Sequence, residues 1–152
     1  PSVAGQIAGY TYKQLLDYKD KVRDSKAMYK RVKKLSNQDL ADLAAWYALQ
    51  TPEPMASPEA KVPELVTKGD KKRLLLGCSF CHGKHGEGKK VQTPSLAGQK
   101  IEYLTDTLMA FKEDDRTNDL FGRMRKVAQR LTDEEIEVLA EFYAAAPVED
   151  DE

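Results

Sequence analysis

A stretch of sequence occurs twice in this chain, and the repeat limits the folds that are open to it. Residues 1–19 match residues 94–112 at a constant offset of 93, with Pro, Ser, Ala, Gly, Gln, Tyr, Leu and Lys in the same places. Farther along, residues 28–48 match residues 124–144 at an offset of 96. The change of offset implies three inserted residues in the second copy, between the two matching blocks. Two blocks in register predict a duplicated structural unit.

The segment between the copies predicts how the domains are divided. Four prolines lie within residues 51–63. Because proline lacks a backbone N–H and favours extended backbone, this segment is expected to be a semi-rigid linker. Residues 1–50 are then the back part of a first domain. Residues 64–147 form a complete second domain, and residues 148–152 form an acidic tail.

The spacing of apolar residues predicts helices. Apolar residues recur at three- and four-residue intervals in several segments, and no segment alternates cleanly as a strand would, so we expect an all-α chain. One helix is expected over residues 99–113 and another from about residue 65 to residue 78. A third helix is expected to begin at Ser36, and the fourth, its equivalent in the second copy, at a capping box at Thr132. The predicted packing residues of these four helices are, in that order, Ile101, Leu104, Leu108, Met109 and Phe111; Leu65, Leu74, Leu75 and Leu76; Leu40, Leu43, Ala44 and Tyr47; and Ile136, Leu139, Ala140 and Tyr143.

Composition and charge exclude several classes of protein. The chain is 41% hydrophobic and 32% charged, which argues against a membrane-embedded protein and against wholesale disorder. No apolar run approaches the roughly 20 residues that span a bilayer. The net charge of −1 hides a gradient from +4 over residues 1–50 to −8 over residues 94–152. The basic run at residues 30–34 contains no aromatic residue, so nucleic acid is not an expected partner.

The most specific motif is Cys78, Cys81 and His82 in the order C-x-x-C-H. Two thiols on one turn of chain can each add to a vinyl group of the same porphyrin, and the next residue can supply a nitrogen ligand to the iron. A zinc site would need two more nitrogen or sulfur ligands, and the other candidate is His85. A redox dithiol of the thioredoxin type would need a βαβ context. The motif therefore predicts one covalently attached haem c.

A haem iron has a sixth position, and the methionines are the candidate ligands for it. Met109 lies on the apolar face of a predicted helix and is expected in the core. Met124 lies in a loop-like stretch before the final helix, and Met28 occupies the matching place in the first copy. We interpret Met124 as the axial thioether ligand, the alternative being that both methionines fill gaps in the core. Ligation by His and Met suits electron transfer better than oxygen or peroxide chemistry.

The residues after the motif form a glycine-rich stretch, residues 83–88, that can fold tightly around the edge of a cofactor. His85 lies in this stretch and is expected to be a surface loop residue. A backbone carbonyl near Thr93 and Pro94 is expected to accept a hydrogen bond from Nδ1–H of His82 and so to fix its tautomer.

At residues 69–146 the pattern of glycines, the C-x-x-C-H motif, the T-P-S-L-A-G-Q block, the methionine and the final capped helix resembles a class I cytochrome c. More narrowly, it resembles the diheme cytochrome c4 type and related diheme subunits such as that of flavocytochrome c sulfide dehydrogenase. Residues 1–50 resemble the back of a preceding domain of the same kind. The resemblance implies a tandem repeat of two cytochrome c-like domains, the first incomplete, each with a small α-helical fold around a haem.

The resemblance also implies roles for particular residues. Cys78 and Cys81 would form the thioether bonds, and His82 and Met124 would be the axial ligands of the iron. Met28 would be the distal ligand of a first haem, whose attachment motif would precede Pro1. We expect the chain to be part of a diheme protein that carries a second haem, the alternative being natural loss of the first one.

Three functions are compatible with these features. The first is a periplasmic electron carrier, exported with a signal peptide that is not in this chain, with redox proteins as donor and acceptor in a respiratory or sulfur-oxidising chain. It would have no membrane span, and peripheral docking to a membrane oxidase or reductase is compatible with it. The second is the electron-accepting subunit of an oxidoreductase complex. The third, an enzyme or gas sensor with an open haem iron, requires a vacant sixth position.

Overall fold

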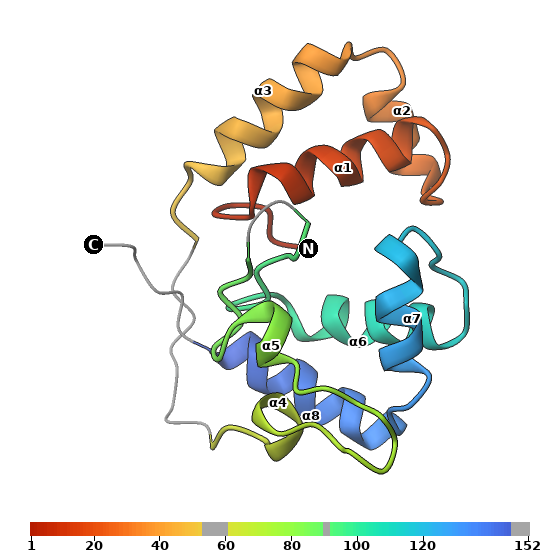
Figure 1. Ribbon diagram of the computed structural model, residues 1–152. Coiled ribbons are helices and arrows are strands. Elements are labelled where there is room, and N and C mark those ends of the chain that lie inside the picture. Colours follow the sequence, from red (N-terminus) through yellow and green to blue (C-terminus); the bar gives the residue numbers. More distant parts are fainter. Residues whose placement is uncertain (53–60, 90–91, 147–152) are drawn as a thin grey trace.

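The computed structural model describes residues 1–52, 61–89 and 92–146, and these residues form helices joined by turns, without a strand among them (Figure 1). Two isolated bridges, between Asp70 and Leu75 and between Lys89 and Thr93, are the only extended pairing in those ranges. The predicted all-α class is therefore confirmed. Most of the predicted linker at residues 51–63, and the whole predicted tail at residues 148–152, lie outside the described residues.

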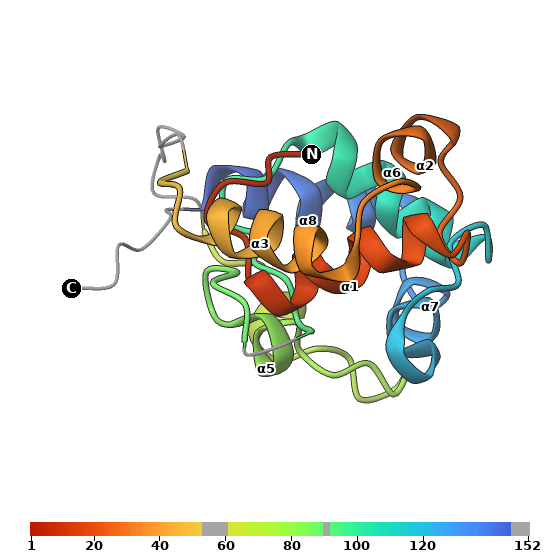
Figure 2. The ribbon, with the colours of Figure 1, turned by 90° about the horizontal axis from the view of Figure 1, so that it is seen from above.

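The helices of the two copies occupy two sides of the molecule (Figure 1). Those of the first copy are α1 (Ala8–Lys19), α2 (Lys26–Val32) and α3 (Asn37–Ala48). Those of the second are α4 (Glu64–Thr67), α5 (Ser79–His82), α6 (Ile101–Lys112), the 3₁₀ turn η1 (Leu120–Gly122), α7 (Arg123–Ala128) and α8 (Asp133–Ala145). The view in Figure 2 places α1 and α3 together over α6 and α8.

The repeat in the sequence is also a repeat in structure. In the first copy α1 packs against α3, and in the second α6 packs against α8. The same backbone hydrogen bond closes each pair: Gly5 donates to the Tyr47 carbonyl over 2.9 Å, and Gly98 donates to the Tyr143 carbonyl over 3.0 Å. The predicted capping box at Thr132 is present before α8, and α3 begins at Ser36 as predicted, also with a capping box.

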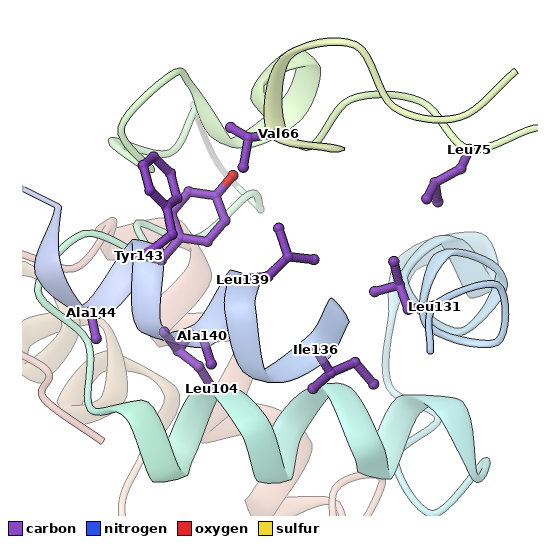
Figure 3. Close-up of a cluster of buried hydrophobic side chains, with 10 residues drawn as sticks. Val66, Leu75, Leu104, Leu131, Ile136, Leu139, Ala140, Tyr143 and Ala144 are labelled. Carbon is purple, nitrogen blue, oxygen red and sulfur yellow. The ribbon is translucent and has the colours of Figure 1, made fainter. Parts of the chain in front are cut away.

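The main hydrophobic core lies around α8 (Figure 3). All four residues predicted to form the packing face of this helix are buried, and Leu104 of α6 lies against them. Val66 of α4 and Leu75 close the opposite side of this core. Met109 is half-buried against the same cluster, as expected of a core methionine. The four confirmed face residues are Ile136, Leu139, Ala140 and Tyr143.

The helix predicted from residue 65 to residue 78 is wrong. Only the single turn α4 is helical there, and Gly69 then turns the backbone with a φ of 66°. The Asp70 carboxylate accepts hydrogen bonds from two following backbone amides, which offers the chain an alternative to the helix. The predicted packing is correspondingly only partly right, because Leu74 and Leu76 are 81% and 68% exposed whereas Leu75 is buried.

Candidate haem site

The turn α5 brings the three residues of the C-x-x-C-H motif together. Amides of Cys81 and His82 both donate to the Cys78 carbonyl, over 3.2 Å and 2.9 Å, so one turn of helix carries both thiols. The Cys81 thiol is exposed, Cys78 is half-buried, and neither cysteine is in a disulfide. Burial raises the pKa of the Cys78 thiol. Two thiols on one turn have the spacing that attachment to two vinyl groups of one porphyrin requires.

The ring of His82 is buried and has a defined orientation. Its Nδ1 lies 3.0 Å from the backbone carbonyl oxygen of Pro94. Because a carbonyl only accepts, Nδ1 carries the proton and the lone pair of Nε2 is left for a metal. Burial lowers the pKa of His82, so the ring is neutral at pH 7. The sequence predicted both this hydrogen bond and its acceptor region.

The glycine-rich stretch after α5 folds against α8. Gly86 has a φ of 89°, and a Cβ atom on it would lie 2.7 Å from the ring of Tyr143. His85 lies in this stretch and is half-buried, and its backbone amide donates to the Glu87 carboxylate. Within the described ranges no group of three or more His, Cys, Asp or Glu residues could hold a metal ion. The zinc alternative therefore lacks the further donors it needs.

The sequence predicted that Tyr143 lies in the core, but it did not predict the environment of the Tyr143 hydroxyl. The Tyr143 hydroxyl is buried beside the Cys78 thiol, and no oxygen or nitrogen of the described residues forms a hydrogen bond with it. Burial, together with the neighbouring Cys78 thiol, raises the pKa of Tyr143. An unpaired buried hydroxyl is costly and is uncommon in native structures. The hydroxyl lies beside Cys78, which shares one turn with Cys81 and with the neutral ring of His82. Together these groups fit a haem as the occupant of this side of the core.

The structure places Met124 and Met28 at matching positions of two short helices. Met124 lies in the first turn of α7, not in a loop as predicted, because η1 and the left-handed Phe121 and Gly122 end the irregular stretch one residue earlier. Met28 lies in the first turn of α2. Both are half-buried, and Met124, unlike Met109, does not pack against the core around α8.

The first copy leaves uncovered a helix face that the second copy covers. Trp46 of α3 is 55% exposed, whereas its counterpart Phe142 is 6% exposed. Leu43 is 37% exposed, whereas its counterpart Leu139 is 3% exposed. The difference arises because α4 and the turns after it cover α8, and none of the described residues covers α3 in the same way. A groove of about 500 Å³ runs along this face, lined by Leu35, Asp39, Asp42, Leu43 and Trp46.

Comparison with known proteins identifies the family. Residues 66–144 match the family model described as cytochrome c. The chain belongs to the cytochrome c family. A cytochrome c4 from Thiocapsa roseopersicina is 35% identical over 151 residues, which cover 93% of this chain and 76% of the relative. The cytochrome subunit of sulfide dehydrogenase from Chlorobaculum tepidum is 36% identical over 101 residues, which cover 66% of this chain and 86% of the relative.

A solved structure agrees with this assignment over both copies. The reduced recombinant cytochrome c4 from Pseudomonas stutzeri matches with a TM-score of 0.88 and 30% identity, covering 95% of this chain and 83% of that one. Membership of the cytochrome c family implies covalently bound haem c, and the cytochrome c4 structures are diheme. The cytochrome c4-like relatives are electron-transfer proteins and not enzymes. Within the described part of the chain, every helix is too short or too polar to cross a membrane.

Proposed function

We propose that this cytochrome c carries single electrons through a haem bound to Cys78 and Cys81 by thioethers, with His82 and Met124 as axial ligands of the iron. The observation that carries the proposal is the geometry of His82. Its Nδ1 is engaged by the Pro94 carbonyl, and the ring is buried and neutral, so that Nε2 is a preformed ligand one residue from the second thiol.

The chain's own residues favour electron transfer over reaction at the iron. Haem c, when bound, supplies reversible one-electron chemistry. The buried ring of His82 holds a fixed tautomer, so its orientation need not change with the oxidation state. The apolar wall formed by Leu139 and Tyr143 limits water at this side of the core. A thioether from Met124 would occupy the sixth position, raise the reduction potential and keep other ligands from the iron.

The proposal extends to the first copy. Residues 1–50 would be the back part of a first haem domain and residues 64–147 the complete second one, with Met28 as the distal ligand of a first haem. The uncovered apolar face of α3 supports this, since its counterpart on α8 is covered by α4 and the turns after it, the front part of the second domain. The position of Met28 supports it too, because it matches Met124 in the sequence repeat and in the helix that carries it.

We place this carrier in the periplasm, in a respiratory or sulfur-oxidising chain. Covalent haem attachment through two reduced thiols, and the cytochrome c4 relatives, support this location. The alternative, the electron-accepting subunit of an oxidoreductase, is supported by the likeness to the cytochrome subunit of sulfide dehydrogenase. Purification from the native source distinguishes the two, because a stable complex with a second, substrate-oxidising chain supports the alternative.

The ligand assignment is tested with Met124→Ala and Met109→Ala in the haem-loaded protein. Met124→Ala should abolish the methionine-to-iron charge-transfer band of the oxidised form, lower the reduction potential and let the reduced form bind CO. Met109→Ala removes a methionine of the core and should leave the band in place. An unchanged band in Met124→Ala would overturn this assignment. Haem content per chain tests the first site, since a second haem requires a further attachment motif.

A further inference from the structure

The three residues inserted in the second copy lie directly before the helix that carries the proposed axial ligand. In the first copy, residues 24–27 join an arginine to Met28. In the second copy, residues 117–123 join the equivalent arginine to Met124. The two copies therefore begin their methionine-bearing helices in different ways.

In the first copy an ordinary N-cap begins the helix that carries Met28. Ser25 has extended backbone, and its hydroxyl oxygen accepts a hydrogen bond from the Met28 amide over 3.3 Å. This hydrogen bond fixes the backbone of the methionine itself. Three positions before Met124, where Ser25 stands relative to Met28, the second copy has Phe121, whose side chain contains no acceptor.

In the second copy the carboxylate of Asp119 accepts the corresponding hydrogen bonds. Its Oδ2 accepts from the Arg125 amide over 3.1 Å, and its Oδ1 accepts from Nε of Arg125 over 2.8 Å. The backbone carbonyl of Asp119 accepts from the Gly122 amide over 3.2 Å. A residue outside α7 therefore binds both the turn before Met124 and the residue after it.

These contacts enclose the Asp119 carboxylate. Its side chain is 3% exposed, whereas that of Asp114, which lies 3.6 Å from Nη1 of Arg125, is 56% exposed. Burial raises the pKa of Asp119, but the hydrogen bonds and the charge of Arg125 outweigh burial, so that the pKa lies below its usual value. The carboxylate is therefore ionised at pH 7, and its hydrogen bonds to Arg125 are charge-assisted and among the stronger kind.

The turn that Asp119 closes is strained. Phe121 has a φ of 57° and Gly122 a φ of 65°, so two consecutive residues lie in the left-handed region. This conformation is unfavourable for a bulky residue such as Phe121. The Phe121 ring is 76% exposed and lies beside the Arg123 guanidinium, so burial in the core does not hold the turn in this conformation. The hydrogen bonds of Asp119 span the turn from one end to the other.

The core around α8 holds the end of α7 but not its start. Val127 packs against this core and Ala128 is buried, whereas Met124 is half-buried and lies outside the cluster. α7 has six residues, and a helix of that length is not stable on its own. The direction of the Met124 side chain therefore depends on how the first turn of α7 is held.

We propose that Asp119 is a positioning residue for Met124, because its carboxylate holds the first turn of α7 against the strained turn at residues 121–122 and so presents the thioether to the haem iron. The inference rests on the proposed ligation of that iron by Met124. Asp119 acts through the backbone on either side of the methionine. It therefore changes how firmly the ligand is held and not which atom binds the iron.

The first test measures how readily an added ligand displaces Met124. Imidazole is titrated into the oxidised, haem-loaded protein, and the loss of the methionine-to-iron charge-transfer band gives its dissociation constant. Imidazole should bind about tenfold more tightly to Asp119→Ala than to the wild type, because a released methionine turn spends more time open. Asp119→Asn retains an oxygen that can accept from the Arg125 amide, and the gain in imidazole affinity should be about threefold.

Asp114→Asn is the matched control, because it removes one negative charge that also faces Arg125. Asparagine tolerates the left-handed backbone of this position, where φ is 61°. Among the described residues, the Asp114 carboxylate meets the side chains of Arg125 and Gln129, over 3.6 Å and 3.0 Å, and not the backbone around Met124. An exposed ion pair contributes little, so Asp114→Asn should change the imidazole dissociation constant by less than about twofold.

The second test follows the backbone by amide hydrogen exchange in the reduced, haem-loaded protein. Asp119→Ala should speed exchange of the Ala128 amide in α7 relative to that of the Ala140 amide in α8. A general loss of stability would speed both amides alike, so the ratio of the two rates distinguishes release of α7 from destabilisation of the whole fold. An unchanged ratio would contradict the role of Asp119.

The outcomes separate this inference from the proposed function. Loss of the charge-transfer band in Met124→Ala tests ligation itself. An unchanged imidazole dissociation constant in Asp119→Ala and Asp119→Asn, with the band and the covalent haem content intact, would overturn the inference and leave the ligand assignment standing. Equal gains in Asp119→Asn and Asp114→Asn would overturn it as well, since they would show an effect of charge near Arg125 alone.

Discussion

Gln6 and Ser95 exchange two hydrogen bonds across the boundary between the copies. Nε2 of Gln6 donates to the Ser95 carbonyl and the Ser95 amide donates to Oε1 of Gln6, each over 2.9 Å. Their equivalents in the repeat, Gln99 and Ser2, exchange the same two hydrogen bonds in the opposite direction, over 2.9 Å and 2.7 Å. The boundary is therefore self-complementary, as the interface of a twofold-symmetric dimer is.

This symmetry predicts that Gln6→Ala and Gln99→Ala destabilise the protein by similar amounts. Each substitution leaves a backbone amide and a carbonyl of the partner serine unpaired, and both glutamines are buried. We expect a loss of about 1–3 kcal/mol in the free energy of unfolding for each variant. Urea denaturation of the haem-loaded protein measures it.

Gln38→Ala is the matched control, because Gln38 is an exposed glutamine of α3 whose amide contacts only the neighbouring turn. It should change the free energy of unfolding by less than about 0.5 kcal/mol. A large loss in Gln6→Ala beside no loss in Gln99→Ala would contradict the symmetric boundary.

The parts of the fold that could be predicted are those determined by local sequence. The capping boxes at Ser36 and Thr132 fix helix starts through contacts three residues apart, and the apolar face of α8 follows from its own spacing. The prediction was wrong for the segment after Glu64, where a helix was expected. Three consecutive leucines at residues 74–76 suggested a helix face, but consecutive apolar residues do not lie on one side of a helix. The positive φ of Gly69 and the hydrogen bonds of the Asp70 carboxylate determine the backbone conformation here.

The part of the candidate site that could be predicted is the C-x-x-C-H turn, because the spacing within the motif is enough to place its three residues together. The contacts between the copies could not be predicted in the same way. The repeat shows that Tyr10 matches Tyr103 and that Arg23 matches Arg116, but it does not show which tyrosine binds which arginine. That choice depends on how the copies pack, which is a tertiary property.

A second prediction concerns the core around α8. Ile136 is fully buried against α6, and Ile136→Ala should cost about 2–5 kcal/mol because it removes apolar contacts and leaves a cavity. Val138 lies on the same helix but is 50% exposed, so Val138→Ala should cost much less. Thermal or urea unfolding measures both, and comparable losses would contradict the assigned face of α8.

A third prediction concerns Gly86, whose backbone approaches the ring of Tyr143. An alanine there would have to adopt a φ of 89° and would place its Cβ 2.7 Å from that ring. Gly86→Ala should therefore destabilise the fold by about 1–3 kcal/mol and lower the fraction of chains that carry covalent haem. In Gly122→Ala the nearest atom belongs to the flexible end of Arg125 at 3.3 Å, so the loss should be smaller. Haem absorbance per mass of purified protein is the readout, and equal yields for the two variants would argue against a tight approach at Gly86.

A fourth prediction concerns pH and the pair formed by Arg73 and Glu135, which ties the turns after α4 to the start of α8. Nη2 and Nη1 of Arg73 donate to the two oxygens of the Glu135 carboxylate over 2.7 Å and 2.8 Å, and these hydrogen bonds hold the pKa of Glu135 below its ordinary value. A carboxyl whose pKa is lowered by folding stabilises the protein above its unfolded pKa, and that contribution is lost as the pH falls through the folded pKa. Glu135→Gln should therefore be less stable than the wild type at pH 7, and the difference should shrink below about pH 4. Urea unfolding midpoints at a series of pH values test this, with the exposed Glu141→Gln as control, and a difference that grew on acidification would reverse the assigned sign.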